Sequence, residues 1–339
     1  MTILGVTLWR FETKPPAPHT LVMLSIASVA VFSNSQSATA DEGGVPFWFS
    51  GGYASLAAVP TSPGWSLPVQ GYYYSGDASR SKSFTRGESV TLGLESSMPL
   101  LFAQPTYSPE TKVLGGQLAL GLGFGYANNT TDAEVSVFPS GAGLGRSDSV
   151  SGFTDLYPVA SLAWTSGADN WMTYLTGDIP VGSYESNRLA NIGIGHGAVD
   201  VGGGYTYLNE KNGREFSAVL GLTYNSENTS TNYRNGIDSH LDWAASQFLS
   251  ANWEVGLVGY VYYQLTGDSG SGATLGPFKS KVAAIGPELG YAFTIGGQPA
   301  YANLRGYWEF WAENRTDGYA LFATVAIPLG PQKTTGVSN

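Results

Sequence analysis

The 339-residue sequence contains no cysteine, few charged residues and no long hydrophobic run after residue 40. Without cysteine, the chain can form neither a disulfide framework nor a thiolate metal site. A membrane-spanning helix needs roughly 18 or more consecutive apolar residues, so a polytopic helical membrane protein is excluded. Intrinsic disorder is also excluded, because 42% of the residues are hydrophobic and 13% are aromatic.

Charged residues make up 12% of the chain, against roughly 25% in an average soluble domain. The formal net charge is −10, which argues against nucleic acid as a partner because phosphate backbones are bound by basic surfaces. Glycine is abundant, with 45 residues. The composition therefore describes an acidic, glycine-rich and aromatic-rich chain with an ordinary hydrophobic content.

The first forty residues have the pattern of an export signal. Basic residues precede an apolar run from Leu21 to Phe32, and Ala38-Thr39-Ala40 is the small-x-small pattern that signal peptidase cleaves. We therefore predict a signal peptide over residues 1–40, whose true start could lie nearer Met23. The alternative is an uncleaved N-terminal anchor, for which the apolar run is short.

The rest of the chain alternates with a period of two residues, as β-strands do. In 253–263 the odd positions are mostly apolar with an aromatic residue at each end, and the even positions carry small, polar and tyrosine side chains. Segments 215–225, 281–293, 300–311 and 317–328 repeat this pattern.

Alternation also occurs in soluble β-sandwiches, but three features favour a membrane barrel. The alternating runs, about 9–13 residues long, match the roughly 9–11 residues that a tilted strand needs to cross a bilayer. Aromatic residues gather at the ends of the apolar face, as they do at membrane interfaces. The opposite face is rich in glycine and isolated charges, which suits a wet lumen.

Connectors between the strands alternate between long and short, as outward loops and periplasmic turns do in outer-membrane barrels. We predict an all-β fold, a transmembrane antiparallel up-and-down β-barrel of about twelve strands. If 133–139 lies in a long outer loop the count is twelve, and if it pairs with 143–151 the count is fourteen. The twelve predicted strands are 66–75, 86–104, 112–127, 153–164, 170–178, 197–208, 214–225, 238–250, 253–264, 281–294, 299–311 and 317–328.

Residues 41–65 precede the first strand and do not alternate, yet Trp48, Phe49, Tyr53 and Leu56 make this segment too apolar for a free tail. We expect it to form a plug inside the barrel, because a lumen of this width needs filling. The alternative is a periplasmic segment lying across the barrel mouth. The barrel itself is predicted over 66–330, followed by a C-terminal tail, 331–339.

Two stretches of the sequence resemble a known family. They are WFSGGYASLAAVPTSPGWSL (48–67), followed by GYYYSGDASRSKSF (71–84), and IGPELGYAF (285–293), followed by ANLRGYWEFWAENRTDGYALFATVAIPLG (302–330). They are similar to the two ends of a family of outer-membrane transporters first noted with the meta-cleavage pathway of phenol degradation. The resemblance implies a barrel that passes small hydrophobic or aromatic molecules, by distant analogy with fatty-acid and toluene porins. The Asn-Pro-Ala hatch motif of the fatty-acid transporters is absent.

The sequence offers little for catalysis. A lipid-hydrolysing barrel needs a serine activated by a nearby histidine, but strand alternation puts Ser239 on the face opposite His240 and Asp242. The histidines and carboxylates are not clustered as metal ligands are. GLGFG (121–125) lies in a strand and is not followed by a helix, as a nucleotide loop is. We therefore predict no enzyme, metal or cofactor.

Charged residues on the alternating strands are predicted to face the lumen, because a charge on the lipid face costs about 2–4 kcal/mol near the membrane midplane. Arg305 is expected to pair with Glu288 or Glu309 and to tie the plug to the wall. The aromatic side chains of the same wall are candidates for stacking on aromatic solutes. The predicted lumen and solute-pathway residues are Glu95, Asp155, Asp178, Asp200, Glu215, Glu254, Tyr260, Tyr262, Glu288, Tyr301, Arg305, Tyr307, Glu309 and Trp311.

Together these observations predict a passive channel in the outer membrane of a Gram-negative bacterium. Its expected partners are outer-membrane lipid and a small hydrophobic or aromatic, phenol-like solute that diffuses into the periplasm. An excess of carboxylates in the lumen would disfavour anionic solutes. The alternative is a structural or adhesive barrel whose long outer loops, 128–152, 179–196 and 265–280, bind partners.

Overall fold

The computed structural model describes residues 37–38, 44–86, 89–137 and 142–329. Apart from residues 37–38, the predicted signal peptide lies outside these ranges, and so does the predicted tail, 331–339. Within them, no helix is long and apolar enough to cross a membrane.

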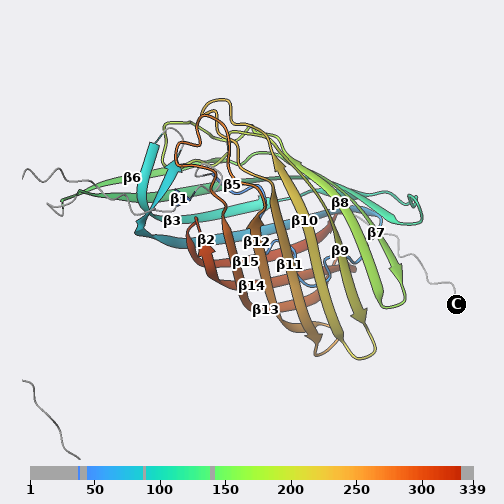
Figure 1. Ribbon diagram of the computed structural model, residues 1–339. Helices are drawn as coiled ribbons and strands as arrows, with labels where there is room; N and C mark the ends of the chain where they lie inside the picture. The colour runs from blue at the N-terminus through green and yellow to red at the C-terminus, as the bar shows by residue number, and fades with distance from the viewer. Residues whose placement is uncertain (1–36, 39–43, 87–88, 138–141, 330–339) are drawn as a thin grey trace, which may run out of the picture. The chain divides into compact units, whose positions relative to one another are not determined.

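Twelve antiparallel strands of the described chain close into a ring in sequence order (Figure 1). Each strand pairs with its neighbours along the chain, and β2 pairs with both β3 and β15, which closes the ring. The predicted barrel of about twelve strands is therefore confirmed. The strands are β2 (Gly64–Arg86), β3 (Ser89–Ala103), β5 (Gln117–Val137), β7 (Tyr157–Ser166), β8 (Asp169–Asp178), β9 (Ala198–Asn209), β10 (Arg214–Asn225), β11 (Asp238–Phe248), β12 (Trp253–Gln264), β13 (Lys281–Ile295), β14 (Gln298–Glu313) and β15 (Asp317–Leu329).

Three further strands pair at the edges of this ring. β1 (Ser37–Ala38) runs parallel to the far end of β2, and β4 (Thr106–Ser108) pairs with β2 and β5. β6 (Ala142–Phe153) pairs with the outer part of β5, and β7 pairs with the inner part of the same strand. β6 and β7 therefore pair with successive parts of β5, and residues 154–156 lie between them.

Two expected loops are β-hairpins instead. Residues 76–85 belong to β2, which continues to Arg86, and most of 128–152 belongs to β5 and β6, which extend past the neighbouring strands as a long hairpin (Figure 1). Residues 133–137 do pair with 142–146, but they lengthen existing strands, so the ring keeps twelve. The alternation does not mark these residues as strands, because beyond the bilayer the outer face of a strand meets water and carries polar residues such as Asp132 in place of apolar ones.

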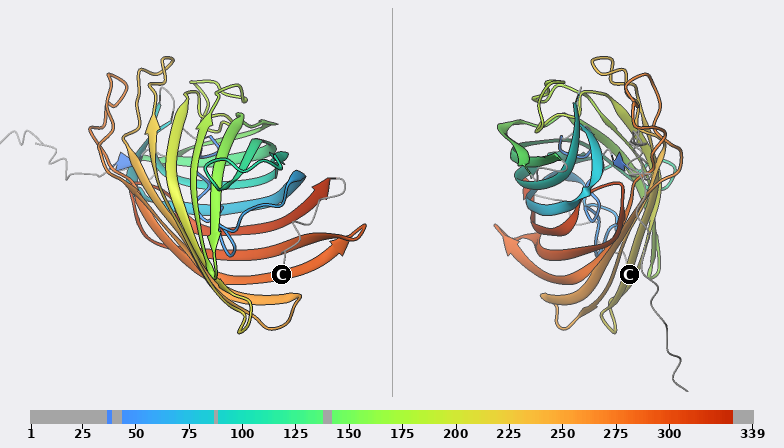
Figure 2. Two further views of the ribbon diagram at one scale, coloured as in Figure 1. Left: turned by 90° about the vertical axis from the view of Figure 1, so that its right-hand side faces the viewer. Right: turned by 60° about the vertical axis from the view of Figure 1, so that its left-hand side comes forward.

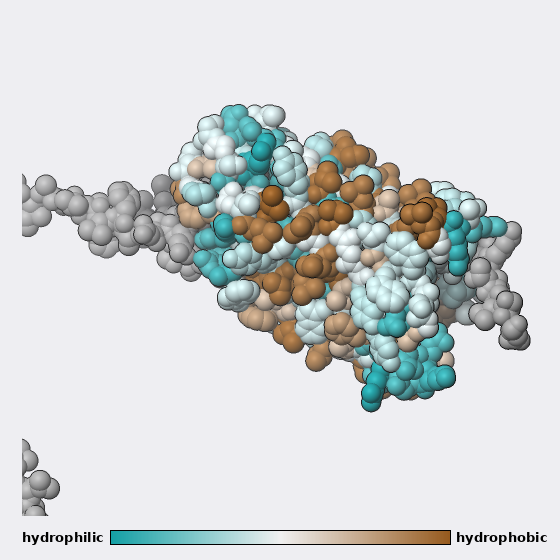
Figure 3. All heavy atoms as spheres, turned by 45° about the vertical axis from the view of Figure 1, so that its right-hand side comes forward, coloured by the Kyte–Doolittle hydropathy of each residue, from teal (hydrophilic) through white to brown (hydrophobic). Residues whose placement is uncertain are grey.

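The outer face of the wall is apolar. Leu220 and Leu257 are 60% and 53% exposed, and apolar side chains cross the visible face of the wall between hydrophilic ends (Figure 3). Aromatic pairs such as Trp253 with Tyr291 lie toward the ends of the strands. Such a surface would aggregate in water, whereas it matches the lipid-facing band of an outer-membrane barrel. The protein therefore resides in the outer membrane of a Gram-negative bacterium.

Short turns and long loops lie at opposite ends of the barrel (Figure 2). The turn between β13 and β14 has only two residues, Gly296 and Gly297, with positive φ angles of 58° and 78°. Glycine adopts these angles without a steric penalty, and two of them in succession make the type I′ turn that fits twisted hairpins. The long connectors 179–197, 226–237 and 265–280 lie at the other end, which we assign to the cell exterior.

Candidate functional site

Residues 44–63 run inside the ring of strands (blue in Figure 2). Val45 and Ala58 are completely buried, and the Val45 N–H donates a hydrogen bond of 2.9 Å to the Ile192 carbonyl oxygen of an outer loop. Phe49 packs against Tyr72 and Phe102 on the wall. The segment contains no helix or strand, so its backbone N–H and C=O groups need partners from elsewhere.

Wall carboxylates supply acceptors for this backbone. Asp242 on β11 accepts hydrogen bonds from the N–H groups of Gly51 (2.9 Å) and Tyr53 (3.2 Å). Glu215 on β10 accepts one from the Leu56 N–H at 3.0 Å. The period-two pattern of the strands places these carboxylates inside, where lipid cannot reach them. Burial, with Asp242 nearby, raises the pKa of Tyr53 well above its ordinary value.

Two further residues of β14 bind carbonyl oxygens of the segment. The Arg305 guanidinium donates to the Gly52 carbonyl at 3.1 Å, and the Tyr307 hydroxyl donates to the Gly51 carbonyl at 3.1 Å. Arg305 thus ties the segment to the wall through a backbone oxygen. Among the described residues, Arg305 forms no ion pair within 4 Å with Glu288 or Glu309, the pairing that was expected. Glu288, opposite Arg305 in the strand pairing, binds Ser55 and Asn303, and Glu309 pairs with Arg315.

Trp48 is stacked against the wall. Its indole ring lies 3.4 Å from the His240 ring, centroid to centroid, at an interplanar angle of 19°. The His240 Nε2 atom is 2.8 Å from the Asp200 carboxylate, which also accepts a hydrogen bond from Thr223. This network fixes the imidazole as a platform. Tyr174 flanks the indole on the wall side, at 5.9 Å.

The segment separates two cavities. The outer cavity, about 100 Å³, lies beside the turn that carries Arg315 and Thr316, and the inner cavity, about 310 Å³, lies toward the start of β2. Phe47 and Trp48 line both. The inner cavity is lined by Phe47, Trp48, Phe49, Gly52, Tyr53, Pro68, Gln70, Phe102, Gln104, Tyr157, Val159, Thr176 and Thr324.

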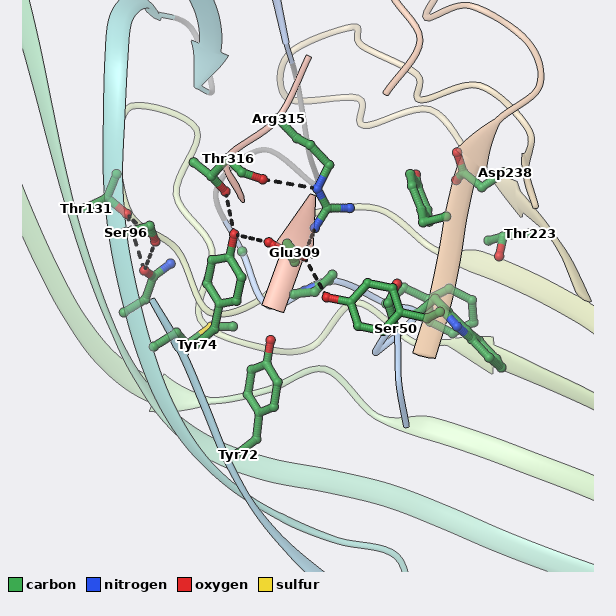
Figure 4. Close-up of a pocket in the computed structure, with 18 of the residues that line it drawn as sticks. Ser50, Tyr72, Tyr74, Ser96, Thr131, Thr223, Asp238, Glu309, Arg315 and Thr316 are labelled. Atoms are coloured by element: carbon green, nitrogen blue, oxygen red, sulfur yellow. Dashed lines mark hydrogen bonds and ion pairs between the residues drawn. The ribbon is translucent and has the colours of Figure 1, made fainter. Parts of the chain in front are cut away.

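The outer cavity contains a buried polar cluster (Figure 4). The Glu309 carboxylate accepts hydrogen bonds from the hydroxyls of Tyr74 (3.0 Å) and Tyr260 (2.7 Å) and lies 3.5 Å from the Arg315 guanidinium. Arg315 also lies over the Tyr262 ring. Burial disfavours its charge, but the Glu309 carboxylate holds the pKa of Arg315 above its ordinary value.

The outer loop 179–197 folds inward over this region. Leu189, Ile192 and Ile194 are completely buried, which is unusual for a loop that faces water. Asp155, at the break between β6 and β7, accepts hydrogen bonds from the N–H groups of Gly182 (2.7 Å) and Ile194 (2.9 Å). Asp155, which was predicted to line the solute pathway, therefore anchors this loop.

Other predicted residues are buried in the interior wall. The Tyr301 hydroxyl donates to Glu254 at 2.7 Å, and Asp178 is buried at the end of β8. The structure thus brings most of the predicted residues together around residues 44–63 and the outer cavity.

Two predicted residues lie elsewhere. Glu95 is exposed on the outer face in the exterior half of β3, opposite Asp77 and Asp132 of the neighbouring strands. Trp311 is 56% exposed and lies against Lys281. The pairing of β13 with β14 shifts register between Lys281 and Ala283, and Trp311 itself has a φ of 58°, so the alternation is interrupted there.

Several residues of the site were not predicted. Alternation places Asp242 beside His240 as a polar pair facing the lumen, but it gives no sign that Asp242 binds the segment. Tyr74 and Phe102 lie on predicted strands, and an even-odd reading of β2 and β3 could have found them. Arg315 lies in a turn, where no periodicity indicates that a side chain points into the barrel.

The structure places Ser239 apart from His240. The Ser239 hydroxyl is exposed and donates to the Tyr263 carbonyl at 2.9 Å, on the face opposite His240. Across the described residues, no group of three or more histidines, aspartates or glutamates is arranged to hold a metal ion.

Comparisons with known proteins agree with this architecture. A family model described as "Putative MetA-pathway of phenol degradation" matches residues 79–325. No curated protein matches the sequence.

Among solved structures, an outer-membrane channel from Pseudomonas putida F1 matches with a TM-score of 0.61 and 14% identity, over 79% of this chain and 97% of that chain. The transport unit of the autotransporter AIDA-I from Escherichia coli matches with a TM-score of 0.44 and 11% identity, over 81% of this chain and 92% of that one. A FadL homologue from Pseudomonas aeruginosa matches with a TM-score of 0.39 and 11% identity, over 86% and 84%. The first of these likenesses supports the barrel fold.

Proposed function

The chain belongs to this phenol-degradation family, and from that premise we propose that it is a passive channel for small hydrophobic or aromatic compounds. Phenol-like solutes would diffuse through it into the periplasm. In this proposal residues 44–63 act as a plug that narrows the lumen, and the lipid-facing wall is only the support.

The inner cavity is the observation that carries the proposal. Its lining contains no charged side chain and is dominated by aromatic rings, with Gln70, Gln104, Thr176 and Thr324 as neutral polar groups. An apolar cavity of roughly 150 Å³ holds benzene, so about 310 Å³ suits one aromatic ring with substituents. These neutral polar groups can accept a hydrogen bond from a phenolic hydroxyl or donate one to it.

The charges of the lumen support selection against anions. Asp242 and Glu215 already bind backbone N–H groups, and Glu309 is paired with Arg315. The wall still carries more carboxylates than basic groups, which disfavours anionic solutes and admits neutral ones. We therefore expect phenol to pass faster than benzoate.

Influx into vesicles with a lipopolysaccharide outer leaflet tests the proposal. Vesicles that contain the protein should take up radiolabelled phenol faster than protein-free vesicles, and faster than they take up benzoate. Thr176→Trp would fill the inner cavity and should reduce phenol influx several-fold. Thr173→Trp, on the outer face of the same strand, is the matched control and should leave influx unchanged. Influx equal to that of protein-free vesicles would refute the channel.

A further inference from the structure

Phe47 and Trp48 line both cavities, and of the two rings the Trp48 indole makes the closer stack, 3.4 Å from His240 against 6.2 Å between Phe47 and Tyr157. The outer cavity has tyrosines and polar groups on its other sides, and the inner cavity has neutral and aromatic groups. A solute that moves from one to the other passes beside the rings of Phe47 and Trp48. The Trp48 indole rests on the His240 platform, and its Nε1–H has no hydrogen-bond partner among the described residues.

We propose that Trp48 is the specificity-determining gate of the channel. The indole moves off His240 to join the two cavities, while the backbone on either side stays bound to the wall. This inference rests on the proposed channel function and assigns its selectivity to one side chain.

The hydrogen bonds explain why the side chain moves and the segment stays. Rotation of the indole breaks no hydrogen bond within the described structure, because its Nε1–H has no partner there. It breaks only the ring contacts with His240, Tyr53 and Tyr174 and the packing on the neighbouring buried side chains. Release of the segment would break the bonds of Asp242 to Gly51 and Tyr53 and that of Glu215 to Leu56. Buried N–H groups that lose their acceptors are strongly unfavourable.

The same geometry favours a planar aromatic solute. When the indole leaves, the exposed His240 ring is a flat platform with Tyr53 and Tyr174 beside it. A planar ring can take the place of the indole in this stack, whereas a bulky saturated ring cannot. Asp200 keeps the platform in place through its contact with His240.

A disulfide that fixes the segment to the wall distinguishes movement of the side chain from release of the segment. The Ser55 and Ser246 hydroxyl oxygens are 3.0 Å apart, so cysteines at these positions are suitably placed to form a disulfide. The chain has no other cysteine. Oxidised Ser55→Cys/Ser246→Cys should retain most of the phenol influx of its own reduced form. Loss of influx on oxidation, with recovery on reduction, would overturn the gate.

Substitution of Trp48 tests the selectivity. Trp48→Ala should join the cavities, raise the single-channel conductance several-fold and increase influx of naphthol and cyclohexanol relative to phenol. Trp48→Phe keeps a ring on His240 and should give a smaller change. Trp308→Ala, on the lipid face, is the matched control and should keep the wild-type ratios. Wild-type ratios in Trp48→Ala would contradict the inference.

These outcomes separate the inference from the proposed function. If the wild-type protein moves no phenol, the channel proposal fails. If phenol influx is present but Trp48→Ala leaves conductance and solute ratios unchanged, only the gate fails.

Discussion

Asp242 gives the sharpest test of how the segment is held in the lumen. Its carboxylate is buried, and its two oxygens accept separate hydrogen bonds from the Gly51 and Tyr53 N–H groups. Asp242→Asn keeps the shape of the side chain but replaces one acceptor oxygen with an NH₂ donor. One buried backbone N–H then faces another donor.

The expected effect follows from that lost bond. A hydrogen bond to a charged group contributes about 1.5–3 kcal/mol, and loss of it leaves a buried donor unsatisfied. Since each 1.4 kcal/mol corresponds to about a tenfold change in an equilibrium, the population with the segment displaced should rise about 10- to 100-fold. The barrel wall, whose strand pairing does not involve this side chain, should keep its stability.

Cysteine labelling measures that population. Ala54 is 8% exposed and lies in the segment between the two anchored residues and Leu56, so a maleimide reaches Ala54→Cys only when the segment moves. The labelling rate of Ala54→Cys should rise about 10- to 100-fold when Asp242→Asn is added, in proportion to the open population. Asp77→Asn makes the same change of charge on the exposed outer face and should leave the rate unchanged. Equal rates with and without Asp242→Asn would refute this account of the anchor.

Three more outcomes are expected. Gly51→Ala should also speed labelling of Ala54→Cys, because Gly51 has a φ of +81° and a Cβ atom there would lie 2.7 Å from the Tyr307 ring. Asp155→Asn should loosen the inward loop, so trypsin should cleave after Arg188 faster than in the wild-type protein, as gel analysis would show. Arg315→Gln should leave the Glu309 charge uncompensated, and the reversal potential in a KCl gradient should shift toward cation selectivity.

The sequence by itself determined the barrel, because a backbone that crosses lipid can satisfy its N–H and C=O groups only as a helix or a closed barrel. Alternation in stretches such as 253–263 and 215–225 is required where one face meets lipid and the other does not. The strand count, the order of long and short connectors and the inward position of Glu215, Glu254 and Glu288 followed from that constraint.

Lipid requires an apolar outer face only within the bilayer, and the predictions of side-chain direction fail outside it. Glu95 lies in the exterior half of β3, on the outer face beside Asp77 and Asp132, so the rule that charges point inward does not apply to it. At Trp311 a single irregular residue interrupted the alternation. Where β2, β3 and β5 extend past the bilayer, Ala78, Leu94 and Ala133 pack on Leu189 inside while Asp77, Glu95 and Asp132 lie on the outer face, so the apolar outward alternation is absent there.

Only the tertiary structure decided what fills the lumen. The apolar residues of 41–65 indicated burial, but nothing local selects Asp242 as the acceptor for Gly51 and Tyr53, since these partners are about 190 residues apart. The same holds for Arg305, which binds the Gly52 carbonyl where a carboxylate partner was expected. Period and composition fix which face a side chain occupies, whereas the choice of partner on that face depends on closure of the whole ring.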